Sequence, residues 1–179
     1  MSQTDRTQRF EAAMLPHLDA AYNLARWLLR NEQNAQDVVQ EAYLRAFRFF
    51  DSFRGGDARP WLLSIVRNAC FTWLRERGHD HLEFNEERDS DQRDPALHEA
   101  LEGPVRLLER KLERAQVNAA IATLSPLFRE VLVLREIEAL SYEEIAQVVG
   151  IPAGTVMSRL SRARSMLRAT LAAAADKED

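Results

Sequence analysis

The residues best suited to a chemical role lie in one short segment near the C-terminus. Residues 153–168 contain four arginines and no acidic residue, although Asp and Glu (28) outnumber Lys and Arg (24) in the whole chain. A guanidinium donates to phosphate oxygens and base edges, and serine and threonine hydroxyls add short hydrogen bonds. This composition predicts a DNA-binding segment. The alternative is a solvated helix face that contacts nothing.

A helix-turn-helix would position these arginines. Counted from Tyr142, Ala146, Gly150 and Val156 stand at the fifth, ninth and fifteenth places. Such a motif needs a small residue where two helices cross, a glycine where the chain turns, and an apolar residue where the second helix packs on the first. All three requirements are met in register.

The second helix of this motif has a predicted buried face and a predicted DNA-binding face. At about 100° per residue, Val156, Leu160, Ala163 and Leu167 share a narrow apolar arc. Short polar side chains and arginines occupy the opposite and flanking positions, where they could meet a major groove. The predicted contact residues are Thr155, Met157, Ser158, Arg159, Ser161, Arg162 and Ser165.

A second candidate surface lies on a predicted helix from Trp61 to Arg77. Its polar sector contains Ser64, Arg67, Asn68, Phe71 and Arg75. An exposed phenylalanine between an asparagine and arginines could stack on unpaired bases and hydrogen-bond to them. The alternative is that Phe71 packs on a neighbouring side chain.

A third candidate surface lies further upstream. Asp37, Gln40, Glu41 and Arg45 share one face of a helix predicted over 34–50. That face could dock on a partner or simply be solvated.

The composition excludes several classes of protein. An apolar content of 46% is enough for a core and excludes disorder throughout. Cys70 is the only cysteine, so no internal disulfide can form, and we expect it in the core. With no apolar stretch of about 18 residues and no signal peptide, the protein is expected to be cytoplasmic, with no membrane insertion.

No motif supports an enzyme or a cofactor. The sequence has no phosphate-cradling glycine loop, nucleophile elbow or paired-carboxylate motif. His79, Asp80 and His81 stand together, but a metal site would need further ligands at a matching spacing. The expectation is therefore a protein with no enzymatic activity, no cofactor and no metal.

The net charge of −4 taken alone argues against a nucleic-acid partner, but the charge is segmented. Residues 1–78 carry +2, residues 79–115 carry −5 and residues 116–179 carry −1. Hydrophobic periodicity predicts an all-α protein in which residues 1–78 and 116–179 form two small helical domains joined by a flexible acidic linker, 79–115. A helix is expected to resume near Pro104, and Pro16 is expected to interrupt the first helix.

Four motifs follow one another in the order of a known family. They are Asp37–Phe47 (DVVQEAYLRAF), Phe53–Gly56 (FRGG), Trp61–Asn68 (WLLSIVRN), and Leu140–Ala146 (LSYEEIA) with Gly154–Arg159 (GTVMSR). They resemble the extracytoplasmic-function (ECF, group 4) branch of bacterial RNA polymerase sigma factors. The resemblance implies that the first domain, sigma region 2, binds the polymerase clamp and the −10 promoter element. The second, sigma region 4, is implied to bind the polymerase flap and the −35 element.

The resemblance also assigns residues to these tasks. Clamp binding falls on Asp37, Val38, Gln40, Glu41 and Leu44, and Arg45 lies on the same helical face. Capture of a flipped non-template base falls on Phe53, Arg54, Gly55, Gly56 and Asn68, with Ser64 in the same polar sector. Extruding a base costs a few kcal/mol, which stacking and edge hydrogen bonds in a pocket offset. The −35 contacts fall on Met157, Ser158, Ser161 and Arg162.

Three positions depart from the family pattern. Asn34 and Gln36 stand where many relatives carry Asp and Glu, which removes two charges near the clamp motif. Met157 stands where relatives often carry Lys or Arg, and it cannot bond a phosphate or guanine, so the alternatives are an apolar contact with a thymine methyl or no contact at all.

The predicted function is therefore that of an alternative sigma factor that initiates transcription with core RNA polymerase on promoter DNA, with an anti-sigma factor as a further expected partner. The 37-residue linker could extend to about 120 Å, against roughly 70 Å for two turns of duplex between the promoter elements. One alternative is a stand-alone helix-turn-helix regulator, which would need to dimerise on two half-sites. Another is a sigma-like decoy that sequesters an anti-sigma protein.

Overall fold

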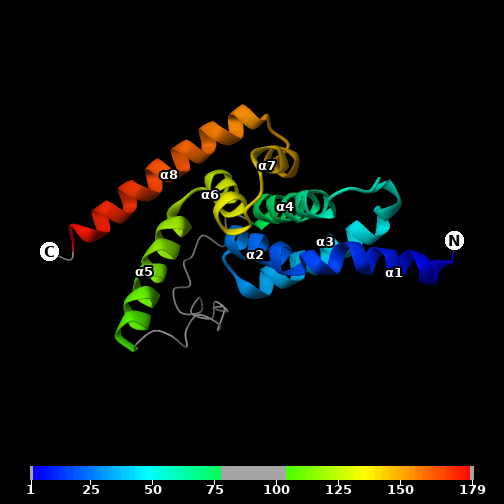
Figure 1. Cartoon of the computed structure of the whole chain (residues 1–179), viewed down its shortest axis with the longest axis horizontal. Coiled ribbons are helices and arrows are strands. Elements are labelled where there is room, and N and C mark those ends of the chain that lie inside the picture. The colour runs from blue at the N-terminus through cyan, green and yellow to red at the C-terminus, as the bar shows by residue number, and fades with distance from the viewer. Residues whose placement is uncertain (1, 78–103, 178–179) are drawn as a thin grey trace.

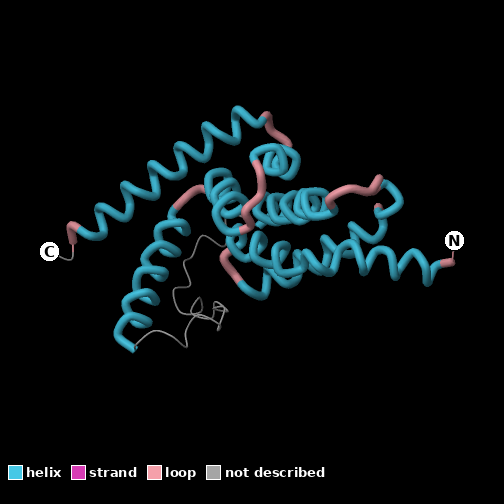
Figure 2. Tube along the Cα trace, in the orientation of Figure 1, coloured by secondary structure: helices cyan, strands magenta, loops and turns pink. Residues whose placement is uncertain are grey.

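The computed structural model describes residues 2–77 and 104–177, and all regular structure in these ranges is helical (Figure 2). This confirms the predicted all-α class. The α-helices are α1 (Gln3–Met14), α2 (Leu18–Leu29), α3 (Glu32–Arg48), α4 (Ala58–Arg77), α5 (Pro104–Thr123), α6 (Pro126–Leu132), α7 (Tyr142–Val149) and α8 (Ala153–Ala175). Two 3₁₀ turns, η1 (Leu15–His17) and η2 (Phe50–Ser52), and a π-helical turn, η4 (Val133–Ile137), complete the set.

In the N-terminal part, α2, α3 and α4 pack against one another, and α1 extends to one end of the molecule (Figure 1). Pro16 lies in η1, so the first helix is interrupted where the sequence predicted. Asn31 starts α3 by accepting a hydrogen bond from the Asn34 amide at 2.9 Å. The apolar stripes of the three helices close over a shared core that includes Leu24, Val39 and Leu62.

An aromatic cluster ties α1 to the loop before α4. Phe10 makes edge-to-face contacts with Phe47 and Phe50 at centroid distances of 5.1 and 5.3 Å. Phe50 stacks on Phe53 at 6.1 Å, and Phe53 contacts Trp61 at 5.3 Å. The loop at Phe53 is therefore held from both sides by rings of η2 and α4.

The helix-turn-helix has the predicted local structure. Ser141 and Glu144 form a capping box at the start of α7. Gly150 ends α7 with a φ of 77°, a left-handed conformation that glycine adopts without strain. Val156 and Leu160 of α8 are 0% and 1% exposed, so the predicted apolar arc faces the core.

The two parts of the chain form one continuous core. Buried residues of α2–α4 and of η4, α7 and α8 belong to a single cluster, and α7 lies against α4 while α6 lies against α2 (Figure 1). Helices α5 and α8 extend from the end opposite α1. Helix α5 begins at Pro104 and so overlaps the predicted linker, 79–115; residues 78–103 lie outside the described residues.

Cys70 belongs to this core, as expected. Its side chain is 0% exposed, and burial raises the pKa of its thiol to about 12, with the Glu130 charge adding to the effect. The thiol is therefore protonated at neutral pH and shielded from reagents. None of the helices in 2–77 and 104–177 has the length and apolar character needed to cross a membrane.

Replacing Gly150 with alanine should destabilise the chain by about 1–2 kcal/mol, because a β-carbon is strained at this φ although nothing lies within 4 Å of it. Urea unfolding followed by circular dichroism measures the change. Gly154→Ala is the matched control: that glycine also has open space, has no positive φ and lies in α8, so alanine should leave stability equal or higher. Equal behaviour of the two variants would contradict the strain at Gly150.

Candidate nucleic-acid interface

The predicted DNA-binding face of α8 is exposed. Met157, Ser158, Ser161, Arg162 and Ser165 are all open to solvent, and Met157 is 53% exposed. Arg162 forms no ion pair or hydrogen bond with any residue in the described part of the chain, so its guanidinium is available to a ligand. Thr155 is half-buried at the start of the same helix. The structure thus brings five of the seven predicted contact residues together on one exposed face, whereas Thr155 and Arg159 are half-buried.

Two other arginines of α8 are engaged within the protein. Arg164 pairs with Glu136 at 2.7 Å, and hydrogen bonding to this carboxylate raises the pKa of Arg164. Arg159 is half-buried and lies 4.0 Å from the carboxylate of Glu130. The freely presented guanidinium near the turn is therefore that of Arg162, with Arg159 partly turned inward.

The glycine loop before α4 presents its backbone to solvent. Gly55 and Gly56 have φ values of 88° and 87°, conformations that other residues resist, and both are exposed. Arg54 is exposed beside them. Phe53, which the resemblance assigns to base capture, is half-buried between the rings of Phe50 and Trp61.

A pocket beside this loop includes residues that the sequence analysis missed. Helix α1 contributes Arg9, Ala12 and Ala13, which face Phe50, Asp51, Phe53, Arg54 and Gly55 across the pocket. Ser64 and Asn68 are not part of its lining. The pocket therefore opens between α1 and the loop, whereas Asn68 is exposed further along α4. These three α1 residues lie in the second half of the helix and belong to no motif, so the sequence gave no signal that they line a pocket.

The polar sector of α4 is divided between solvent and the protein interior. Asn68 is exposed and accepts a long contact from Arg67 at 3.4 Å, and the Ser64 hydroxyl donates to the Trp61 carbonyl at 2.7 Å. Phe71 is half-buried, with the Arg67 guanidinium 4.0 Å above its ring. Packing on a neighbour, the alternative considered for Phe71, is what this structure shows.

Glu130 of α6 is the partner of Arg67. The Arg67 Nε and Nη2 donate to the two carboxylate oxygens of Glu130 at 2.8 and 3.1 Å, and Glu130 is 0% exposed. Burial raises the pKa of the Glu130 carboxyl, while the hydrogen bonds and charge of Arg67 and the charge of Arg159 oppose the shift. A buried carboxylate needs such partners, because the charge has lost its hydration.

Further polar contacts join the N-terminal and C-terminal parts. Arg129, 5% exposed, donates to the carbonyls of Trp27 in α2 and of Leu124 after α5, at 2.8 and 2.6 Å. Arg59 at the start of α4 lies 3.6 Å from the Glu144 carboxylate and donates to the Glu138 carbonyl at 3.2 Å. The two parts are therefore held at several separate points.

The predicted polymerase-binding face of α3 is exposed with one exception. Asp37, Gln40, Glu41, Leu44 and Arg45 are open to solvent, Leu44 by 63%, and Arg45 lies 3.7 Å from Glu41. Val38 is only 4% exposed, because it belongs to the apolar stripe that packs on the neighbouring helices; its assignment to the binding surface is corrected.

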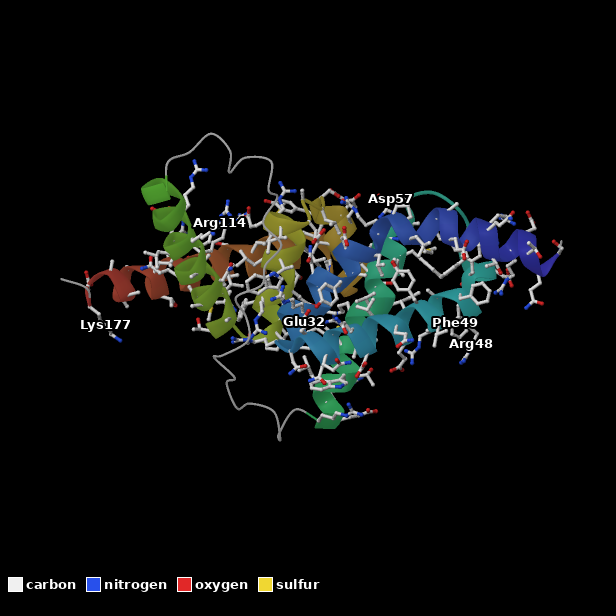
Figure 3. The ribbon with its side chains drawn as sticks, turned by 90° about the horizontal axis from the view of Figure 1, so that it is seen from below. Glu32, Arg48, Phe49, Asp57, Arg114 and Lys177 are labelled. Atoms are coloured by element: carbon white, nitrogen blue, oxygen red, sulfur yellow. The ribbon has the colours of Figure 1, made fainter. Side chains whose placement is uncertain are left out.

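An exposed apolar residue at the end of α3 was missed. Phe49 is 54% exposed and follows the exposed Arg48, and Figure 3 shows both side chains at the surface. Helical periodicity placed Phe49 within the predicted helix 34–50, and residue type alone does not indicate that this phenylalanine is exposed.

The described residues offer no obvious metal site. In 2–77 and 104–177, no group of three or more His, Cys, Asp or Glu side chains is gathered closely enough to hold a metal ion. His79, Asp80 and His81 lie outside the described residues.

Two family models match the chain. Residues 14–79 match Sigma-70 region 2, and residues 114–167 match Sigma-70, region 4. The first match spans α2–α4 with the glycine loop, and the second spans the helix-turn-helix.

Named relatives and solved structures agree with these matches. ECF RNA polymerase sigma factor SigE of Mycolicibacterium smegmatis is 38% identical over 156 residues, which cover 87% of this chain and 59% of that relative, less than two thirds of its length. RNA polymerase sigma-H factor of Pseudomonas aeruginosa is 36% identical over 172 residues, covering 91% and 89%. The ECF RNA polymerase sigma-E factor of Escherichia coli K12 is 37% identical over 135 residues, covering 73% and 70%.

Among solved structures, the sigma factor RpoE in complex with the anti-sigma factor NepR from Bartonella quintana superposes with a TM-score of 0.67 at 30% identity, covering 92% of this chain and 97% of that one. CnrH in complex with the cytosolic domain of CnrY gives a TM-score of 0.64 at 27% identity, covering 93% and 90%. Both halves of the fold, their order and the sequence identity agree: this chain belongs to the ECF RNA polymerase sigma factors, which act in transcription initiation.

Proposed function

We propose that this chain directs core RNA polymerase to specific promoters, with α8 reading the −35 duplex and the loop and helix α4 of region 2 capturing a non-template base of the −10 element. The observation that carries the proposal is the acid-free, exposed face of α8 with an unpaired Arg162 at its centre. Serines on either side of Arg162 allow the helix to approach base edges closely. This is the geometry of a recognition helix.

Capture of the −10 base rests on the loop at 53–56 and on Asn68. The exposed backbone of Gly55 and Gly56 allows close approach of a nucleotide, and Arg54 adds a cation beside it. Phe53 and the α1 residue Arg9 line the adjoining pocket, which offers an aromatic surface for an unpaired base. Asn68 adds a donor and an acceptor on the neighbouring helix face.

Polymerase docking is assigned to the outer face of α3. Leu44 supplies exposed apolar area at the centre of a rim formed by Asp37, Gln40, Glu41 and Arg45. An apolar anchor within a polar rim is the usual form of a protein interface. Docking of region 4 on the polymerase flap completes the proposed holoenzyme.

An anti-sigma protein is the further proposed partner. Of the two solved structures at TM-scores of 0.67 and 0.64, one is a sigma factor in complex with the anti-sigma factor NepR, and the other is CnrH in complex with the cytosolic domain of CnrY. Their similarity across both regions supports an inhibitory partner for this chain.

Run-off transcription with purified core polymerase from the native host tests the proposal as a whole. The chain should produce template-specific transcripts from at least some fragments of a genomic library, and core polymerase alone should not. A complete absence of chain-dependent transcripts would overturn the proposal. Binding of the isolated chain to duplex as a dimer on paired half-sites would instead favour a stand-alone regulator.

Arg162→Ala should weaken −35-dependent transcription by an amount equivalent to about 1–3 kcal/mol, because an exposed base or phosphate contact is lost without a change in the core. The measurement is run-off yield against holoenzyme concentration. Arg168→Ala is the matched control, since Arg168 is another exposed arginine of α8 outside the proposed set. If both variants match the wild type, the face of α8 is merely solvated.

Asn68→Ala should reduce promoter opening while core-polymerase binding remains unchanged, because Asn68 is exposed and its removal leaves no cavity. Permanganate reactivity of −10 thymines measures opening, and co-sedimentation measures polymerase binding. Asn68 is a cleaner target than Phe53, whose loss would also loosen Phe50 and Trp61. Thr72→Ala, one turn further along α4, is the control, and an equal loss of opening there would contradict the assigned role of Asn68.

A further inference from the structure

A carboxylate lines the pocket between α1 and the glycine loop. The pocket has a volume of about 770 Å³, which is in the range of small-ligand sites, and Asp51 is the one acidic residue among its described lining residues. Asn68 lies outside this lining. The choice of a base within the pocket therefore depends on residues other than Asn68.

The other lining residues suit an unpaired nucleotide. Phe50 and Phe53 supply aromatic surface on which a base can stack, and the small side chain of Ala12 in α1 leaves room for the base. The guanidinium groups of Arg9 and Arg54 add positive charge at the pocket, which attracts the phosphates on either side of that base. Stacking and charge alone accept every base, so selection between bases requires a further group.

Helix α1, which runs beside this loop in Figure 1, holds Asp51 in place. The Arg6 Nε donates to Asp51 Oδ1 at 3.2 Å, and the Arg6 Nη2 donates to the Phe47 carbonyl at 2.7 Å. The Arg6 side chain is 23% exposed, whereas that of Asp51 is 69% exposed. Asp51 Oδ2 accepts no hydrogen bond from any residue in 2–77 or 104–177. One carboxylate oxygen is thus fixed and the other is available to a ligand.

The chemistry of a carboxylate distinguishes between unpaired bases. An ionised carboxylate accepts hydrogen bonds and donates none. Cytosine presents its N4 amino group and adenine its N6 amino group, and both groups are donors. Thymine has no amino group, and its single N3–H lies between two carbonyl oxygens that a carboxylate repels. Asp51 therefore favours a base that carries an amino group over thymine.

We propose that Asp51 selects the base in this pocket by accepting a hydrogen bond from the exocyclic amino group of an unpaired cytosine or adenine, and that Arg6 is the positioning residue that orients Asp51. The inference rests on the proposed function for the source of the unpaired base, which is the −10 element. The selection itself requires only single-stranded DNA, so its measurement depends on neither promoter nor polymerase.

Binding of labelled single strands of about 12 nucleotides to the full chain at low salt tests this selection. Oligo(dC) and oligo(dU) form the matched pair, because uracil lacks the thymine methyl and differs from cytosine only in carrying O4 and N3–H in place of the amino group and N3. The wild type should bind oligo(dC) about tenfold more tightly than oligo(dU), the effect of one hydrogen bond to a charged group. Equal affinity for the two strands, or no measurable binding of either, would overturn the proposed site.

Asp51→Asn tests which residue makes the selection. The amide carries both a donor and an acceptor, so the affinity ratio of oligo(dC) to oligo(dU) should fall close to unity. Asp57→Asn is the matched control: Asp57 is exposed, is not among the lining residues, and accepts from the Arg59 amide at 3.0 Å through an oxygen that asparagine also has. Partial unfolding lowers both affinities in equal proportion, so the ratio does not report stability. A wild-type ratio in Asp51→Asn, or an equal loss in Asp57→Asn, would contradict the role of Asp51.

Arg6→Met tests the positioning role. It keeps a long side chain over the Phe47 ring but removes the donors to Asp51, so the ratio should fall by about threefold, as expected for a partly exposed ion pair. Arg6→Lys restores a cation beside Asp51 and should recover part of the ratio. An unchanged ratio in Arg6→Met would show that Asp51 needs no orientation by Arg6.

Ala12→Phe tests whether the strand enters this pocket. A phenylalanine at this exposed lining position should fill the space beside the loop, weaken binding of both strands and remove the selection. Glu11→Phe is the matched control, because Glu11 is the exposed chain neighbour and is not among the lining residues. If the two variants bind both strands equally well, the base is held elsewhere and the proposed site is wrong.

Run-off transcription separates this inference from the proposed function. On a promoter that the wild type transcribes, thymine in place of cytosine or adenine at one non-template −10 position should lower the yield about tenfold, and Asp51→Asn should remove this penalty. Absence of transcription together with selective binding of oligo(dC) defeats the proposed function alone. Transcription by a chain that binds oligo(dC) and oligo(dU) equally defeats this inference alone.

Discussion

The buried carboxylate of Glu130 is the constraint on which the relation between the two halves of the molecule depends. A lone carboxylate in this position would lack hydration and would cost several kcal/mol, so α6 can pack as it does only while Arg67 reaches it from α4. The approach of Arg159 from α8 fixes the same carboxylate from the other side. One charge therefore sets the positions of three helices.

Arg129 is a second buried charged residue of this interface, and its N–H groups also need hydrogen-bond partners because burial removes them from water. Arg129 gives its terminal nitrogens to main-chain carbonyls at the ends of α2 and α5, where helices leave acceptors unpaired. Desolvation lowers the pKa of Arg129 to about 10, with the nearby charge of Arg30 adding to the effect, so the group remains protonated at neutral pH. Its Nε is a buried donor with no partner in the described structure, a cost that the other bonds offset.

Features that depend on local sequence were predictable, and features that depend on distant contacts were not. The turn at Gly150 and the faces of α8 follow from residue types and spacing within a few turns of helix. The burial of Val38 follows from the apolar stripe of α3 and was open to prediction, whereas the ring contacts of Phe53 depend on Trp61 in another element and no local pattern encodes them. The sequence does contain a signal for the burial of Glu130. This acidic residue directly precedes the apolar run 131–134, and a carboxylate buried with that run requires a partner of opposite charge.

The use of carbonyl acceptors by Arg30, Arg59 and Arg129 has an evolutionary consequence. Every residue carries a carbonyl, so the positions that accept these bonds at Trp27, Ala122 and Glu138 can change side chain without loss of the contact. Paired substitutions between the two halves should therefore concentrate at the side-chain contacts, which are Arg67 with Glu130, Arg59 with Glu144 and Asn23 with Glu138. Covariation across an alignment of relatives would therefore detect only a few of the contacts in this interface. The side chains around it can differ widely among homologues that keep the same arrangement of the two halves.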